Sequence, residues 1–391
     1  MPISRSYLVD RALQAQEPAT PDRVAADESN ISLQMLPLPV TVCLISGAEE
    51  KRIGRTLASV NGWAAEIVVV LNEEVMDRTE DICQQYGAKV FRERWKGFVA
   101  QKNSAADKAT QPWLLGLDAD ELVSDALKAE IRSRLAESSL TQDISAFSMP
   151  RMSFYLGSWI RHGDWYPDRK VRLWRRGSAQ WEGTNPHDKL MVHGRTSVLR
   201  SPLLHYSFTD LAHHLRKVNS YGDLFAAARV ASGRPFRGME LLVRPAWRFF
   251  RSYIIRLGFL DGWAGFCVAG MVATETFIRY AKLLEAARSQ APEQTCLTGL
   301  AHHLGQINSH GDLFAAARIA SGRPFRGSEL LIGPAWRFFR SYIIRLGFLD
   351  GLAGFCVAGI VATETFIRHA KLLEVARSQM PEPPLFKWFR N

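Results

Sequence analysis

The chain has 391 residues, of which 47% are apolar and 23% are charged, as in an ordinary globular protein. These values exclude a largely disordered chain, a collagen-like fibre and a small disulfide scaffold. Lys and Arg number 49 against 39 Asp and Glu, which gives a net charge of +10 and points to an anionic partner such as a nucleotide, a nucleic acid or a lipid surface.

The first 36 residues are polar, and they contain no apolar stretch of the kind found in a secretory signal. We expect a flexible leader over residues 1–36 and a protein that works on the cytosolic side. The five cysteines include no CxxC pair, which favours reduced thiols over a disulfide framework or a zinc site.

Strand-like and helix-like segments alternate after the leader. Short apolar runs predict strands at 40–45, 66–71, 88–91 and 113–120, with helices around 49–60, 77–86 and 98–109 between them. Continuous apolar strands separated by helices indicate a parallel sheet covered on both faces. We therefore predict an α/β domain over residues 37–207, built on a doubly wound, mostly parallel sheet.

The fourth predicted strand runs directly into an acidic cluster. Asp118 and Asp120 are two residues apart, and in an extended chain such residues project to the same face. Two neighbouring carboxylates repel unless a cation or a proton lies between them. Carboxylate oxygens suit Mg²⁺ or Mn²⁺ bound together with a substrate phosphate. The cluster predicts a metal–phosphate site at the carboxyl edge of the sheet, with a helix N-cap as the alternative.

The remaining chain has a helical pattern that occurs twice. Residues 211–290 and 300–379 are the same 80 residues, offset by 89 and differing at 12 positions. We predict a helical module at 208–290, a linker at 291–299 and a second copy with a tail at 300–391. Residues 211–290 carry 12 basic and 5 acidic side chains, and residues 300–379 carry 9 and 5, so the basic surplus belongs to the two copies.

Aromatic and basic side chains interleave in each copy, from Trp247 to Arg256 and from Trp336 to Arg345. This pattern is typical of a helix at a lipid headgroup boundary. It could also bind nucleic acid, but no accompanying nucleic-acid motif is visible. The next stretch, 257–278, is long enough to cross a bilayer. It contains two acids and a Gly-Phe-Leu-Asp-Gly turn, which favour a hairpin of interfacial or core helices.

Nine short segments carry a resemblance to a known family: 66–70, 77–79, 95–98, 101–103, 117–121, 169–176, 181–183, 187–190 and 204–207. In their order and spacing, residues 38–207 resemble the family 2 glycosyltransferases with the GT-A fold. The resemblance is strongest to the bacterial lipopolysaccharide core β-glucosyltransferases. It continues into the helical module at residues 253–262.

The resemblance implies an inverting transfer of a hexose from a nucleotide diphosphate sugar to a lipopolysaccharide core or related glycolipid. The expected donor is UDP-glucose. Asp118 and Asp120 would face the ribose and the metal-bound diphosphate, where Mg²⁺ or Mn²⁺ would neutralise the leaving group. Lys102, Arg169 and Arg172 would also lie at the donor site, and arginines there could bind phosphate.

Inversion requires a base that takes the proton of the acceptor hydroxyl. The resemblance assigns this role to Asp188, with His187 orienting it or contacting the diphosphate. Asp164 and Asp168 are the alternatives, and a solvated loop acid is the non-catalytic interpretation of Asp188. His205 is interpreted as a residue that supports the site.

The sequence departs from the family pattern at two places. The turn that usually reads the nucleotide base is replaced by residues 71–77, and Ala48 stands where the family has Asn. Glu50 and Asn72 are the candidates for the missing base and ribose contacts.

Three functions fit the sequence. The first is the glycolipid transferase, bound peripherally to the cytosolic face of the membrane, with no nucleic-acid partner. The second is a degenerate transferase fold that acts as a membrane-surface scaffold. The third is a transferase that uses a peptide or a capsule glycan as its acceptor.

Overall fold

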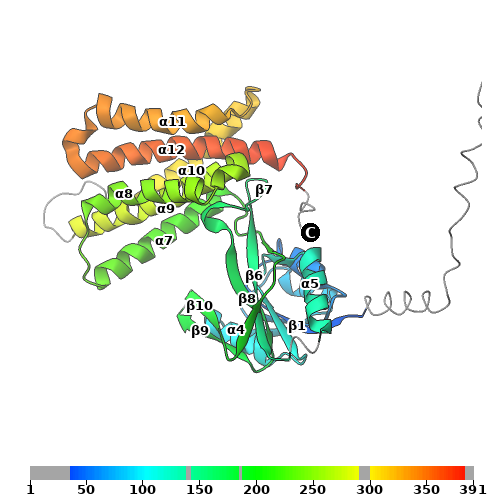
Figure 1. The fold of residues 1–391 in the computed structure, drawn as a ribbon. Helices are drawn as coiled ribbons and strands as arrows, with labels where there is room; N and C mark the ends of the chain where they lie inside the picture. Colours follow the sequence, from blue (N-terminus) through cyan, green and yellow to red (C-terminus); the bar gives the residue numbers. More distant parts are fainter. Residues whose placement is uncertain (1–35, 138–141, 185–186, 290–299, 384–391) are drawn as a thin grey trace, which may run out of the picture.

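The computed structural model describes residues 36–137, 142–184, 187–289 and 300–383. Nearly all of the predicted leader and the whole predicted linker lie outside these residues. Figure 1 shows a lower sheet-containing part and an upper layer of long helices. Cys43, Cys83, Cys267 and Cys356 are buried free thiols, and Cys296 lies outside the described residues.

The first half of the sheet is parallel, as predicted. Its strands are β1 (Leu38–Ser46), β2 (Ala64–Asn72), β3 (Lys89–Glu93) and β4 (Trp113–Leu117), in the order β3-β2-β1-β4. The helices α2 (Ile53–Val60), α3 (Thr79–Gln85) and α4 (Phe98–Asp107) lie between these strands in the chain. Val42, Leu44 and Val69 are fully buried, because strands covered on both faces have no polar side.

The second half of the sheet is mixed. Antiparallel β8 (Asp168–Arg175) lies beside β4, followed by β6 (Ile144–Tyr155), β12 (Leu203–His205) and β5 (Glu121–Val123). Short β7 (Ser158–Trp159) and β11 (Arg195–Val198) pair with β6, and α5 (Asp125–Ala136) follows β5. A separate ribbon consists of β9 (Ala179–Thr184) and β10 (His187–Val192). The domain is thus the predicted α/β fold with a mostly parallel sheet.

Each copy of the repeated sequence forms three long helices. The first copy contains α7 (Leu211–Ala231), α8 (Gly238–Phe250) and α9 (Gly262–Ser289), and the second contains α10 (Leu300–Ala320), α11 (Gly327–Phe339) and α12 (Gly351–Ser378). The element bounds of the two copies differ by 89 residues throughout. Buried side chains from both copies form one hydrophobic cluster.

The predicted helix break is present in both copies. Leu257 and Gly262 have φ of 57° and 60°, and the helices on either side of the break bend by 73°. Glycine adopts a positive φ without strain, which explains why Gly262 ends the turn. Among the described residues, Gly347–Ser378 is long and apolar enough to cross a membrane, and the bent first-copy pair is a second candidate. Core helices of soluble proteins meet the same length and composition criteria.

Candidate functional site

A cleft of about 810 Å³ lies at the carboxyl end of β4, between the sheet, the β9–β10 ribbon and α7. Six of the residues predicted from the sequence line it: Lys102, Asp118, Asp120, Arg169, Arg172 and Asp188. They come from four separate parts of the chain. The fold therefore brings most of the predicted donor site to one place.

The acidic cluster forms a turn, so the prediction of an extended chain there was wrong. The strand ends at Leu117, and the Glu121 N–H donates to the Asp118 carbonyl over 3.0 Å. The helix-cap alternative was also wrong, because Ser124 caps α5 by accepting from the Leu127 N–H. Asp118 and Asp120 nevertheless line the same cleft, since the turn directs both carboxylates to the same side.

Asp118 is held by two cations. Its carboxylate lies 2.5 Å from Arg172 Nη2 and 3.1 Å from Lys102 Nζ. Burial opposes ionisation, but the charges of Arg172 and Lys102 outweigh it and hold the pKa of Asp118 well below its usual value. Arg172 also lies 2.7 Å from Glu121, whose side chain is fully buried. Asp118 is therefore a fixed anion in the wall of the cleft.

The ion pairs of Asp120 are longer than those of Asp118. Its oxygens lie 3.5 Å from His205 Nε2 and 3.6 Å from Arg52 Nη1. Burial raises the pKa of Asp120, whereas the neighbouring His205 and Arg52 lower it, and the net shift is downward. The contact between His205 and Asp120 follows from the sheet register. His205 on β12 pairs with Glu121 on β5, the residue that follows Asp120.

A divalent metal fits Asp120 better than Asp118. The contacts of Asp120 are longer than those of Asp118, and a single carboxylate with substrate phosphates is a common way to hold Mg²⁺. Among the residues that the structure describes, no group of three or more His, Cys, Asp or Glu is arranged to hold a metal ion. The metal role of the two aspartates stays a prediction.

Asp188 lies across the cleft on β10. Its Oδ2 is 2.8 Å from Lys102 Nζ, and its side chain is 16% exposed. Lys102 therefore lies between Asp118 and Asp188, and it also lies 4.5 Å from the centre of the Trp181 ring. The backbone of His187 pairs with Thr184, but its side chain lies outside what the structure describes.

The two alternative bases line an adjoining hollow of about 400 Å³. Asp164 lies 3.2–3.6 Å from Arg248, Arg251 and Arg256 of the helical module, and only 6% of its side chain is exposed. Asp168 lies 2.6 Å from Arg151. Asp164 thus joins the module to the sheet domain, which makes it a weaker candidate for the base than Asp188.

Glu50 follows the carboxyl end of β1, and Asn72 is the last residue of β2. Glu50 Oε2 accepts from the Arg78 N–H over 3.2 Å, and Asn72 Oδ1 accepts from the Glu74 N–H over 3.4 Å. Neither is among the described residues that line the cleft around Asp118. Their roles in base and ribose binding remain predictions.

Several residues of the site were not predicted from sequence. Arg151, Lys217 and Tyr221 line both hollows, together with His205. A sequence signal existed for two of them, because Lys217 and Tyr221 are replaced by Gln306 and His310 in the second copy. Lys217 and Tyr221 are two of the 12 positions at which the copies differ, and in the first copy both line the cleft.

Comparisons with known proteins find glycosyltransferases. The model of Glycosyl transferase family 2 matches residues 41–178. An uncharacterized glycosyltransferase of Rickettsia felis is 30% identical over 280 residues, covering 66% of this chain and 96% of that protein. The lipopolysaccharide core biosynthesis glycosyltransferase LpsC of Rhizobium meliloti is 28% identical over 259 residues, covering 64% and 94%.

A structural comparison found TarS of S. aureus (residues 1–349) with a TM-score of 0.33 and 13% identity, covering 67% of this chain and 95% of that one. On the sequence comparisons, the chain belongs to glycosyltransferase family 2. The family recognised from the short segments is confirmed.

Proposed function

We propose that the protein is a metal-dependent, inverting glycosyltransferase. It transfers a hexose, with glucose the expected sugar, from a nucleotide diphosphate sugar to a lipopolysaccharide core or related glycolipid. The observation that carries the proposal is the arrangement of Asp118, Lys102 and Asp188 across one cleft, with Asp120 beside them. The similarity to LpsC of R. meliloti supports the choice of acceptor.

The donor diphosphate would lie against the basic wall of the cleft. Arg172 and Lys102 supply charge, although both are partly neutralised by Asp118 and its neighbours. Asp120 would hold Mg²⁺ or Mn²⁺, with His205 next to it. A metal bound there supplies charge neutralisation for the leaving diphosphate. UDP is the expected nucleotide.

Asp188 is the proposed base. It lines the same cleft as Asp118 and Asp120, so an acceptor hydroxyl bound in the cleft would be within its reach. Lys102 fixes the position of the Asp188 carboxylate at 2.8 Å, and position is the first requirement of a general base. The acceptor would enter through the adjoining hollow, which α7 borders with Lys217 and Tyr221.

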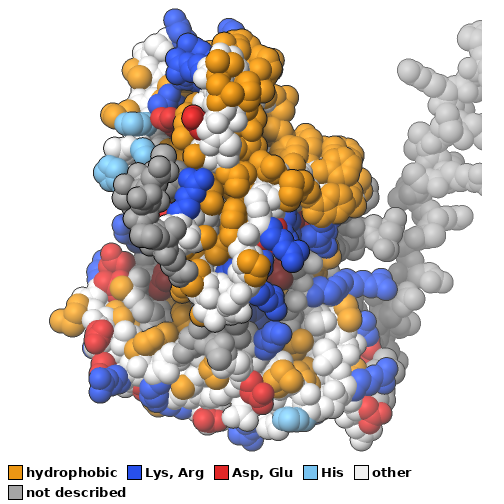
Figure 2. Space-filling model, turned by 90° about the vertical axis from the view of Figure 1, so that its left-hand side faces the viewer, with side chains coloured by type: hydrophobic (Ala, Val, Ile, Leu, Met, Phe, Trp, Pro, Cys, Tyr) orange, Lys and Arg blue, Asp and Glu red, His pale blue; other side chains and the backbone are white. Residues whose placement is uncertain are grey.

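We place the protein at the cytosolic face of the membrane, bound through its helical part. Trp247, Phe250 and Ile255 of the first copy are about half exposed, as are Trp336, Phe339 and Ile344 of the second. Figure 2 shows hydrophobic side chains gathered on the helical part, with Lys and Arg beside them. Aromatic and basic side chains on one helix suit a lipid headgroup boundary, where a glycolipid acceptor would be available.

The test is turnover of UDP-glucose and other sugar nucleotides with Mg²⁺ or Mn²⁺, for wild type and for Asp120→Ala. We expect a loss of about 100-fold or more in the variant, because the metal is worth several kcal/mol of leaving-group stabilisation. Asp125→Ala is the control, since the Asp125 side chain is 99% exposed on α5. Equal turnover for Asp120→Ala and wild type would refute the proposal.

The altered base-reading turn at residues 71–77 favours a second candidate, a degenerate transferase fold that serves as a membrane scaffold. Calorimetry with UDP and Mn²⁺ separates the two functions. Binding of UDP that is lost in Asp120→Ala supports the enzyme. Absence of UDP binding together with strong binding to anionic vesicles supports the scaffold.

A further inference from the structure

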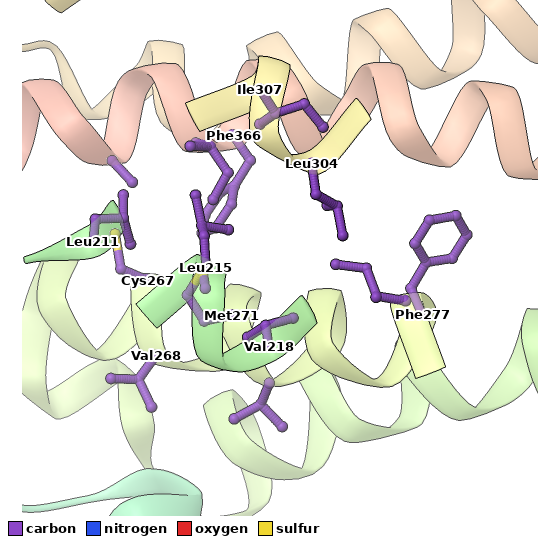
Figure 3. Close-up of a cluster of buried hydrophobic side chains, with 14 of the residues drawn as sticks. Leu211, Leu215, Val218, Cys267, Val268, Met271, Phe277, Leu304, Ile307 and Phe366 are labelled. Carbon is purple, nitrogen blue, oxygen red and sulfur yellow. The ribbon is translucent and has the colours of Figure 1, made fainter. Parts of the chain in front are cut away.

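The two copies of the helical module pack against each other through the same residues on both sides. Equivalent helices are in contact, α7 with α10 and α9 with α12. Leu215 and its equivalent Leu304 lie in one buried cluster, as do Val218 and its equivalent Ile307. Figure 3 shows side chains of both copies meeting in this cluster.

Two close contacts in the interface are reciprocal. A methyl group added at Gly270 would lie 2.5 Å from the Phe366 ring, and one added at Gly359 would lie 2.5 Å from the Phe277 ring. Gly359 is the copy of Gly270, and Phe366 is the copy of Phe277, 89 residues later in each case.

A second set of contacts repeats this relation. Gly238 lies against Leu352, and its copy Gly327 lies against Trp263, the residue equivalent to Leu352. In such an interface, a residue of the first copy contacts a residue of the second copy, and the equivalents of these two residues contact each other with the copies exchanged. This arrangement is isologous, as in a two-fold symmetric dimer.

The sheet domain is bound by opposite ends of the two copies. The first copy uses its hairpin turn, where Asp261 accepts from the Arg161 and His162 N–H groups and lies 2.9 Å from the His162 ring. In the second copy the equivalent turn is at the far end of the helical layer from the sheet domain (Figure 1).

The second copy uses the end of α12 instead. Arg377 donates to Ser158 Oγ on β7, and Glu374 accepts over 2.7 Å from the N–H of Leu211, the first residue of α7. Just beyond the helix, Glu382 accepts from the Tyr206 hydroxyl over 2.5 Å. Tyr206 follows His205, and its N–H donates to the Asp120 carbonyl. The second copy therefore contacts the segment that places His205 beside Asp120.

The first copy has the same helix end, but this end lies elsewhere. Glu285 and Arg288 are the equivalents of Glu374 and Arg377. They are near the end of α9, which lies on the side of the helical layer away from the sheet domain (Figure 1). A two-fold arrangement requires this result, because it sends equivalent ends in opposite directions.

We propose that the second copy takes the place of the module of a second subunit. It pairs with the first copy through a two-fold interface, and the end of α12 contacts and stabilises the sheet domain. The duplicated chain thus contains within itself the contacts of a dimer whose subunits each carry one module. The R. felis relative is matched over 96% of its length by 66% of this chain, so that relative is shorter by about the size of one copy with the leader. The proposal does not depend on the catalysed reaction.

The first experiment compares equivalent substitutions in the full-length protein by hydrogen exchange. We expect Glu374→Ala to speed exchange of the amides around Leu211, and Arg377→Ala to speed exchange of the amides around Ser158, each by about fivefold or more, because each change removes the contact of α12 with that segment. The matched controls Glu285→Ala and Arg288→Ala should leave these amides unchanged. Equal effects of the two pairs would overturn the proposal.

The second experiment uses full-length protein with a protease site placed in the linker, residues 291–299. After cutting, we expect both pieces to elute together, and we expect the melting temperature to rise with protein concentration, as in a dimer. Phe277→Asp should make the pieces separate, because the ring lies against Gly359. Separation of the pieces without this substitution, or a melting temperature independent of concentration, would contradict a subunit-like interface.

Discussion

Lys102 reaches from α4 to Asp188 on β10, with 2.8 Å between Nζ and Oδ2, although the residues are 86 positions apart. The same ammonium lies 3.1 Å from Asp118. One cation therefore connects the acidic turn after β4 with the ribbon on the other side of the cleft. The site is held together by this long-range pairing as much as by the acidic motif itself.

Lys102→Met should lower turnover by about 100-fold. Without the shared cation, Asp118 keeps only its pair with Arg172, Asp188 loses its pair with Lys102, and the donor diphosphate loses a positive partner. Lys128→Met is the control, because Lys128 pairs with the exposed Asp125 on α5. Initial rates with a sugar nucleotide measure the effect. Undiminished turnover in Lys102→Met would show that the bridge has no catalytic role.

The sequence predicted the parallel strands and the acidic cluster because both depend on local signals, whereas Lys102 and Asp188 were predicted from the family resemblance. Apolar runs mark β1 to β4, and the acids follow β4 directly. The turn at Asp118 could not be foreseen, because its geometry depends on Arg172 and on the burial of Glu121. The ion pair of Arg151 with Glu121 joins β6 to β5, and no spacing in the chain indicates a contact of this kind.

Arg172→Met should destabilise the protein by about 3–5 kcal/mol, since it leaves the buried Glu121 without one of its cations. The double variant Arg172→Met with Glu121→Gln should recover part of this loss, because the buried carboxylate that has lost one of its two cations is then neutral. Chemical denaturation measures both values. If the double variant were less stable than Arg172→Met, the charge of the buried Glu121 would not be the cause.

Glu374 gives the protein a pH-dependent stability. Burial raises the pKa of Glu374 to about 7 from the usual 4.5, although the Leu211 N–H opposes the shift. The folded protein therefore binds this proton more tightly than the unfolded chain, so the contribution is greatest below about pH 4.5 and is lost as the pH rises to about 7.

Melting temperatures at about pH 5 and about pH 8 test this dependence. Relative to wild type, Glu374→Gln should show a smaller fall in melting temperature toward high pH, because an amide cannot ionise. Glu285→Gln, the same change in the first copy, should follow the wild-type curve. A Glu374→Gln profile that matches wild type would contradict the buried-acid explanation.

Membrane binding should depend on the exposed aromatic residues of the two copies. Trp247 and Trp336 are each 51% exposed. Replacing both with Ser should weaken binding to phosphatidylserine vesicles about tenfold, and added salt should weaken it further through screening. Trp95→Ser is the control, because Trp95 is exposed on the sheet domain. Equal vesicle binding by all three proteins in a flotation assay would place the membrane contact elsewhere.

The reciprocal interface predicts that two substitutions 89 residues apart have the same cost. In Gly270→Val and in Gly359→Val, the added Cβ would lie 2.5 Å from a phenylalanine ring of the other copy. Each substitution should therefore destabilise the fold by about 1–3 kcal/mol. Gly305→Ala is the control, because nothing lies within 4 Å of its added methyl group, and alanine favours a helix over glycine by about 1 kcal/mol. Thermal unfolding of the three full-length variants gives the comparison. A two-fold contact packs both glycines in the same way. A large loss of stability at one glycine and none at the other would therefore mean that the two copies do not meet through equivalent surfaces.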